Sequence, residues 1–139
     1  MLGIISVFSM LIICSVTDMK IRLVSVIPCI LYSMAGIVVG MLQGEKPVYI
    51  LIGTLPGLVL YIISTISRGE IGKGDAMVFI TIGIWLGIVK SIEIFMVALF
   101  CTSFCMMPIL WLKKKSMKTQ VPFIPFVLLS FVIINVIEV

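Results

Sequence analysis

Six long apolar segments, separated by short charged runs, fill most of this chain of 139 residues. A helix needs about 20 apolar residues to cross the hydrocarbon core of a bilayer, with a range of about 17 to 25. Backbone groups in lipid must be satisfied internally, so continuous segments of this length are expected to be helices. The sequence therefore predicts an all-α, polytopic membrane protein, with residues 1–139 forming one domain, a bundle of six transmembrane helices. The predicted spans are Met1–Thr17, Val24–Leu42, Val48–Ser67, Ala76–Val89, Ile94–Leu112 and Val121–Val139, of which the fourth is short, at 14 residues (89 − 76 + 1).

The composition excludes a soluble protein and argues against nucleic-acid binding. The chain is 62% hydrophobic and 12% charged, whereas a soluble domain is about half apolar and about a quarter charged. The net charge of +4 comes from short runs between the apolar segments. Because these runs form no basic face, no nucleic-acid partner is expected. The first segment lacks a basic start and a small-residue cleavage site, so we interpret it as a retained helix.

The basic residues indicate how the chain is oriented in the membrane. The second and fourth predicted loops carry only Lys46 and Lys90, each near an acid. The other loops carry eight basic residues: Lys20, Arg22, Arg68, Lys73, Lys113, Lys114, Lys115 and Lys118. The positive-inside rule places these odd-numbered loops in the cytoplasm of a cell bounded by the inner (plasma) membrane, with both termini outside. The same loops are expected to contact anionic lipid headgroups.

Two aspartates lie where predicted spans meet the cytoplasm. Asp18 follows the first span, and Asp75 ends the string Gly72-Lys73-Gly74-Asp75 before the fourth. An ionisable group near membrane depth is costly and is functional by default. Each aspartate also has an alternative interpretation in which its role is only structural. Asp75 could cap its helix, and Asp18 could be a solvated loop acid, although a helix C-terminus is unfavourable for it.

A pair of aspartates on the same face suits the hydrolysis of peptide bonds. Two adjacent carboxyl groups cannot easily both ionise, so one keeps a proton while the other stays charged. The charged group can activate water and the protonated one can donate to the substrate, and neither role is assigned to a particular residue. Gly72 and Gly74 would let a substrate backbone come close. The chain has no histidine, which excludes Ser-His and Cys-His catalysis and the HExxH metalloproteases.

The remaining features predict packing rather than chemistry. No metal site is expected, since histidine and CxxC motifs are absent. The cysteines are interpreted as small buried hydrophobes, with no bridge between the last two, which share one helix face. Glycine pairs four residues apart predict close helix packing, and a Pro-Gly step predicts a kink in the third helix. The residues concerned are Cys14, Cys29, Cys101 and Cys105, then Gly36, Gly40, Gly83 and Gly87, then Pro56 and Gly57.

Three stretches resemble the type IV prepilin peptidases, a family of GxGD aspartyl proteases in membranes. The first is an aspartate followed by a basic loop, the second is the GxGD helix with its GxWLG tail, and the third is a Pro-Phe-x-Pro stretch that opens the last helix. In this chain they read Asp18-Met19-Lys20-Ile21-Arg22, Gly72-Lys73-Gly74-Asp75-Ala76 continuing to Gly83-Ile84-Trp85-Leu86-Gly87, and Pro122-Phe123-Ile124-Pro125-Phe126. Together with six spans, the resemblance covers nearly the whole chain.

The resemblance implies a catalytic pair formed by Asp18 and Asp75. The pair would cleave the basic leader of prepilin or pseudopilin precursors at the cytoplasmic face, before the precursor's apolar helix, as in type IV pilus assembly and protein secretion. No metal or other cofactor is implied. The chain lacks the methyltransferase domain with CxxC motifs found in many members, so it resembles the compact form and S-adenosylmethionine is not expected. It departs from the family pattern at Val24-Ser25-Val26 and at Met77.

The residues alone also allow a different class of function. A small transporter subunit or an assembly scaffold would also be apolar throughout. In such a protein Asp18 and Asp75 would form a proton relay, or would serve only as cap and loop acids.

Overall fold

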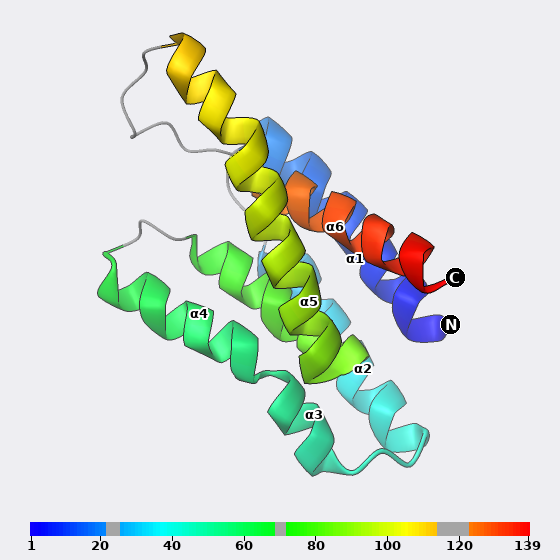
Figure 1. Cartoon of the computed structure of the whole chain (residues 1–139). Coiled ribbons are helices and arrows are strands. Elements are labelled where there is room, and N and C mark those ends of the chain that lie inside the picture. The colour runs from blue at the N-terminus through cyan, green and yellow to red at the C-terminus, as the bar shows by residue number, and fades with distance from the viewer. Residues whose placement is uncertain (22–25, 69–71, 114–122) are drawn as a thin grey trace.

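The structure is a computed structural model that describes residues 1–21, 26–68, 72–113 and 123–139, and every regular element in these ranges is a helix. Figure 1 shows the elements packed side by side in a bundle. The all-α prediction is therefore confirmed. The helices are α1 (Leu2–Ile21), α2 (Val26–Leu42), α3 (Pro47–Gly53), α4 (Leu55–Ile66), α5 (Lys73–Lys113) and α6 (Ile124–Glu138).

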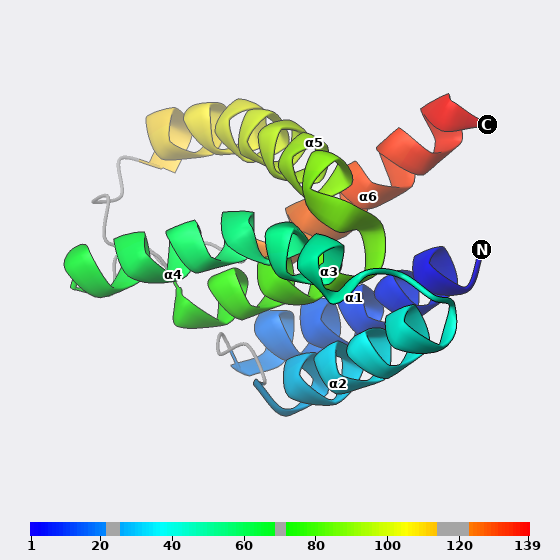
Figure 2. The same ribbon diagram turned by 90° about the horizontal axis from the view of Figure 1, so that it is seen from below.

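Helix α5 reverses direction at Gly87. This residue has φ +83° and ψ 174°, a backbone conformation that glycine adopts without the steric cost of a side chain. Residues 73–86 form a first arm and residues 88–113 a second arm, which run back past each other (Figure 2). The sequence placed this turn in a loop around Lys90 and Glu93, which is wrong, since both residues are helical in the second arm. A lone left-handed glycine is sufficient for the reversal.

The third predicted span is one apolar segment that the structure divides into α3 and α4 at Thr54. Pro56, in the first turn of α4, has no N–H to donate to a preceding carbonyl, which explains a break close to the predicted kink. Helix α1 continues to Ile21, past the predicted end at Thr17. The predicted starts at Val24 and Val121 lie outside the described residues.

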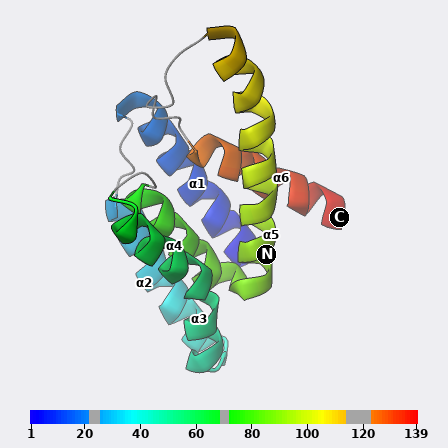
Figure 3. The ribbon, with the colours of Figure 1, turned by 60° about the vertical axis from the view of Figure 1, so that its left-hand side comes forward.

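Three of these helical stretches are long and apolar enough to cross a membrane. They are Leu2–Ile21, Pro47–Ile66, which combines α3 and α4, and Lys73–Leu112. Val26–Leu42 and Ile124–Glu138 are shorter apolar helices. Both chain ends lie at the right-hand side of Figure 1, while Figure 3 shows the C-terminal end of α6 extending away from the N-terminus. This pattern indicates an integral membrane protein.

Glycines allow the helices around the first arm of α5 to approach closely. A methyl group on Gly83 would overlap the carbonyl oxygen of Gly53 in α3, and one on Gly57 would overlap the backbone of Ile80. On the other side, a methyl group on Gly36 of α2 would lie 2.8 Å from Trp85 Nε1. The close packing predicted for Gly36 and Gly83 is confirmed, while Gly87 forms the turn instead.

The buried core lies between α1, α2, both arms of α5 and α6. Phe79 is fully buried in the first arm and meets Phe95 of the second arm edge to face, with ring centroids 5.2 Å apart. Trp85 donates from Nε1 to the Tyr32 carbonyl of α2 at 2.9 Å. In lipid the hydrophobic effect gives helices little reason to associate, so such packing and interhelical hydrogen bonds hold the bundle together. The first arm is thereby fixed to its neighbours on both sides.

Candidate active site

Asp18 lies in the last turn of α1 with its carboxyl group buried. The residue is only 6% exposed. Its side chain accepts a hydrogen bond from the backbone N–H of Ile124, the first residue of α6. The second oxygen, Oδ2, has no hydrogen-bond partner among the described residues. A buried carboxyl group is costly unless it is paired, so the geometry contradicts the alternative in which Asp18 is a solvated loop acid.

Asp75 lies in the first turn of α5 and is half-buried. The Gly72 carbonyl accepts from the N–H of Asp75 at 3.1 Å and of Ala76 at 3.4 Å, so the helix begins at Lys73. Asp75 is therefore the third helical residue and not the N-cap that the sequence allowed. An acid in the first turn is favoured by the helix dipole. A methyl group on Gly72 would lie 3.0 Å from Asp75 Oδ2, so glycine leaves this carboxyl group room.

The fold brings these two carboxyl groups together, although 56 residues separate them in the chain (75 − 18). The C-terminal end of α1 and the N-terminal end of α5 lie at the same end of the bundle (Figure 1). The Asp18 and Asp75 side chains are near enough to interact electrostatically. The site therefore consists of two acids on neighbouring helices, one buried and one half-buried.

The start of α6 lies next to Asp18 through Ile124. Phe123 precedes the helix, and its ring lies 6.3 Å from that of Phe79, measured between centroids. Pro125 is half-buried in the first turn. Pro122, the remaining predicted motif residue, lies outside the described residues. Sequence reasoning missed Ile124, because its contribution is a backbone N–H that no side-chain pattern reveals.

A pair of thiols lies beneath the acids and was also missed. Cys14, one turn before Asp18 in α1, and Cys29 of α2 are buried with their sulfur atoms 3.9 Å apart. Their separation in the chain carries no signal, because only the packing of α1 on α2 brings them together. Of the other cysteines, Cys101 is half-buried and Cys105 is exposed, so the prediction that all four are buried is wrong for these two.

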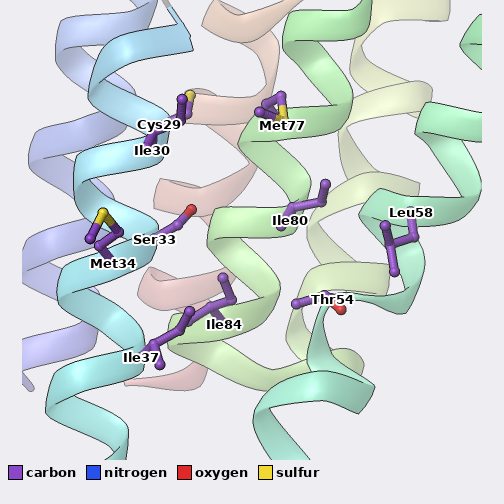
Figure 4. Close-up of a pocket in the computed structure, with 10 residues that line it drawn as sticks. All are labelled: Cys29, Ile30, Ser33, Met34, Ile37, Thr54, Leu58, Met77, Ile80 and Ile84. Carbon is purple, nitrogen blue, oxygen red and sulfur yellow. The ribbon is translucent and has the colours of Figure 1, made fainter.

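An apolar groove opens between α2, α4 and the first arm of α5, with a volume of about 380 Å³ (Figure 4). Met77, two residues after Asp75, lies at one end, and Ile84 and Thr54 lie toward the other. Ser33 supplies a hydroxyl group, which is bonded to that of Thr81 at 2.8 Å. Apart from Ser33 and Thr54, the residues that line the groove are apolar.

Within the described ranges, no three side chains of the kinds that bind metals gather in one place. The arrangement instead defines a class of protein: an integral membrane protein of apolar helices with two adjacent carboxyl groups at one end. The chain matches the type IV leader peptidase family over residues 5–137. Because this match covers nearly all of the chain, the protein belongs to the type IV leader peptidase family, whose members are prepilin-type leader peptidases. Searches among curated proteins and among solved structures give no match.

Proposed function

We propose that the protein is an aspartic endopeptidase that removes the basic leader from prepilin-like or pseudopilin-like precursors, with Asp18 and Asp75 as its catalytic pair. The observation that carries the proposal is the buried Asp18 carboxyl group within electrostatic range of Asp75. Family membership supports a peptidase. The two acids supply the groups that an aspartic mechanism needs.

The chemistry follows from two carboxyl groups that share one proton. The ionised carboxylate takes a proton from a water molecule, whose oxygen bonds to the carbon of the scissile amide. The protonated carboxyl group gives its proton to the amide oxygen. When the tetrahedral intermediate collapses, the C–N bond breaks and the nitrogen takes a proton from the pair. The products are a carboxyl terminus and an amine, and the pair titrates as a unit throughout.

We infer six membrane passes from the helices and the charge pattern. Gly87 divides α5 into two passes, and α3 with α4 makes one, which gives six with α1, α2 and α6. An even number agrees with the two chain ends lying on the same side of the molecule in Figures 1 and 2. By the positive-inside rule, the end of the bundle that holds Asp18 and Asp75 faces the cytoplasm of a plasma membrane, and both termini face outward.

The proposed client is itself a membrane protein. Its basic leader would lie among anionic headgroups at the cytoplasmic surface, and its apolar helix would lie within the bilayer. Cleavage between the two regions requires acids at the membrane surface, which is where Asp18 and Asp75 lie in the proposed orientation. Gly72, which has no side chain, leaves room beside the Asp75 carboxyl group.

Co-expression with a reporter precursor tests the proposal. The reporter carries a basic leader, a glycine and an apolar helix, and its mass is measured after purification from membranes. We expect loss of the leader only when the protein is present. A reporter that keeps its leader at full expression of the protein would favour the transporter or scaffold class instead. Neighbouring genes for precursors of this kind would supply the natural client.

A further inference from the structure

We propose that Phe123 is a positioning residue, a role that rests on the proposed function. Its ring packs on Phe79 and holds α6 so that the Ile124 N–H donates to Asp18. The residue touches neither the reacting water nor the substrate. It acts on catalysis through the orientation of one carboxyl group.

Few polar groups among the described residues restrain the Asp18 carboxyl group. One oxygen of its buried carboxyl group receives the Ile124 N–H, and Oδ2 has no partner among the described residues. Among the described residues, the Ile124 N–H is therefore the one polar group that orients this carboxyl group toward Asp75.

The first turn of α6 supplies the hydrogen-bond donor to Asp18. The N–H groups at the start of a helix have no partner within the helix. Phe126 and Val127 donate to the Phe123 carbonyl, at 3.0 and 3.2 Å. Pro125 has no N–H at all. Ile124 is thus the residue of this turn whose N–H is free to leave the helix, and it reaches Asp18.

A contact between two aromatic rings fixes this turn of α6 in place. The Phe123 ring lies 6.3 Å from the Phe79 ring at 40° between planes. Phe79 is fully buried, also meets the Phe95 ring edge to face, and lies one turn after Asp75 on the same arm. Residues four apart share a helix face. One aromatic contact therefore ties the helix of Asp75 to the backbone group that orients Asp18.

A matched contact elsewhere on α6 provides the control. Phe8 of α1 stacks on Phe131 of α6 with the same centroid separation, 6.3 Å. It lies ten residues before Asp18, which is about 15 Å along the helix. Phe8→Leu therefore removes an aromatic contact between α6 and the bundle without touching the turn that faces Asp18.

Kinetics of purified full-length variants on the reporter precursor test the proposal. We expect Phe123→Leu to lower kcat by about tenfold or more, the size expected for a lost hydrogen bond to a charged group. KM should stay unchanged in Phe123→Leu. Phe123→Tyr, which keeps an aromatic ring, should have the wild-type kcat, and so should Phe8→Leu. A loss confined to KM, or an equal loss in Phe8→Leu, would overturn the assignment.

Replacing the Ile124 N–H by an ester oxygen tests whether Phe123 acts through that group. The change is made with the α-hydroxy analogue of isoleucine, and it should lower kcat as Phe123→Leu does. In the ester background, Phe123→Leu should have no further effect, since both changes remove one interaction. Effects that multiply independently would contradict the proposal.

Nuclear magnetic resonance of protein labelled with ¹⁵N-isoleucine needs no client. The Ile124 amide resonance is assigned as the one that is missing from the spectrum of the Ile124→Val variant. It should shift in Asp18→Ala and in Phe123→Leu, and stay in place in Phe8→Leu. An unmoved resonance in Phe123→Leu overturns the positioning role even where the reporter is cleaved. An uncleaved reporter with a shifted resonance would instead count against the proposed function alone.

Discussion

Gly53 of α3 and Gly83 of α5 touch backbone to backbone. A side chain on either residue would overlap the carbonyl oxygen of the other. The contact fixes α3 against the arm whose first turn carries Asp75. In lipid, small residues of this kind allow the van der Waals packing that holds helices together. This contact therefore makes a direct prediction about stability.

Gly83→Ala should destabilise the protein strongly. The added methyl group meets rigid backbone, so the helices must separate, and overpacking of this kind costs about 1–3 kcal/mol or more. Gly40→Ala is the matched control, because its methyl group would lie 2.9 Å from the Ile50 Cδ1, the movable end of a side chain. Thermal unfolding in detergent should show a clearly lower Tm for Gly83→Ala than for Gly40→Ala. Equal values would contradict the contact.

Oxidation should join Cys14 to Cys29. The two sulfur atoms are 3.9 Å apart, and a disulfide brings them to about 2.05 Å. Iodine, which enters membranes, would take two electrons from the thiols and release two molecules of hydrogen iodide. Peptide mapping of the Cys101→Ser, Cys105→Ser variant should show a product two mass units lighter that links α1 and α2. Reaction of the exposed Cys105 in the wild-type protein shows that the iodine is active. If Cys14 and Cys29 both remain free thiols under these conditions, the pairing is refuted.

The hydrogen bond from Trp85 to the Tyr32 carbonyl should contribute measurably to stability. Trp85→Phe removes the donor and leaves a half-buried carbonyl in α2 without it. A typical net contribution is about 0.5–1.5 kcal/mol. Trp111→Phe is the control, since Trp111 is 86% exposed. Unfolding in detergent should separate the two variants, and identical stabilities would show that the hydrogen bond contributes nothing.

Much of this fold could be predicted because lipid imposes one simple rule on the chain. Long apolar segments must be helices, and this alone indicated the all-α class and most segment boundaries. The turn at Gly87 could not be located in the same way. The apolar pattern continues across it, and the reversal depends on one backbone angle that glycine permits. Charged residues mark loops poorly where a glycine can turn a helix inside an apolar stretch.

Part of the candidate site could be predicted from the sequence and part could not. Asp18 and Asp75 stood out because ionisable groups are costly in lipid. The Ile124 N–H and the Cys14–Cys29 contact did not, because the first is a backbone group and the second depends on packing between helices. Side-chain chemistry can be recognised in a sequence, but the groups that orient it are set by tertiary structure.

Cleavage of the reporter precursor by Asp18→Asn and Asp75→Asn tests the central claim most directly. Each substitution keeps the size of the side chain and removes its acid. Glu45→Gln serves as the control, since Glu45 is exposed in the turn after α2. Unfolding in detergent first establishes that all three variants are folded. We expect each aspartate variant to lose about a hundredfold or more in rate, as for a missing general acid or base, while Glu45→Gln retains wild-type activity. Cleavage at the wild-type rate by either folded aspartate variant would contradict the catalytic pair.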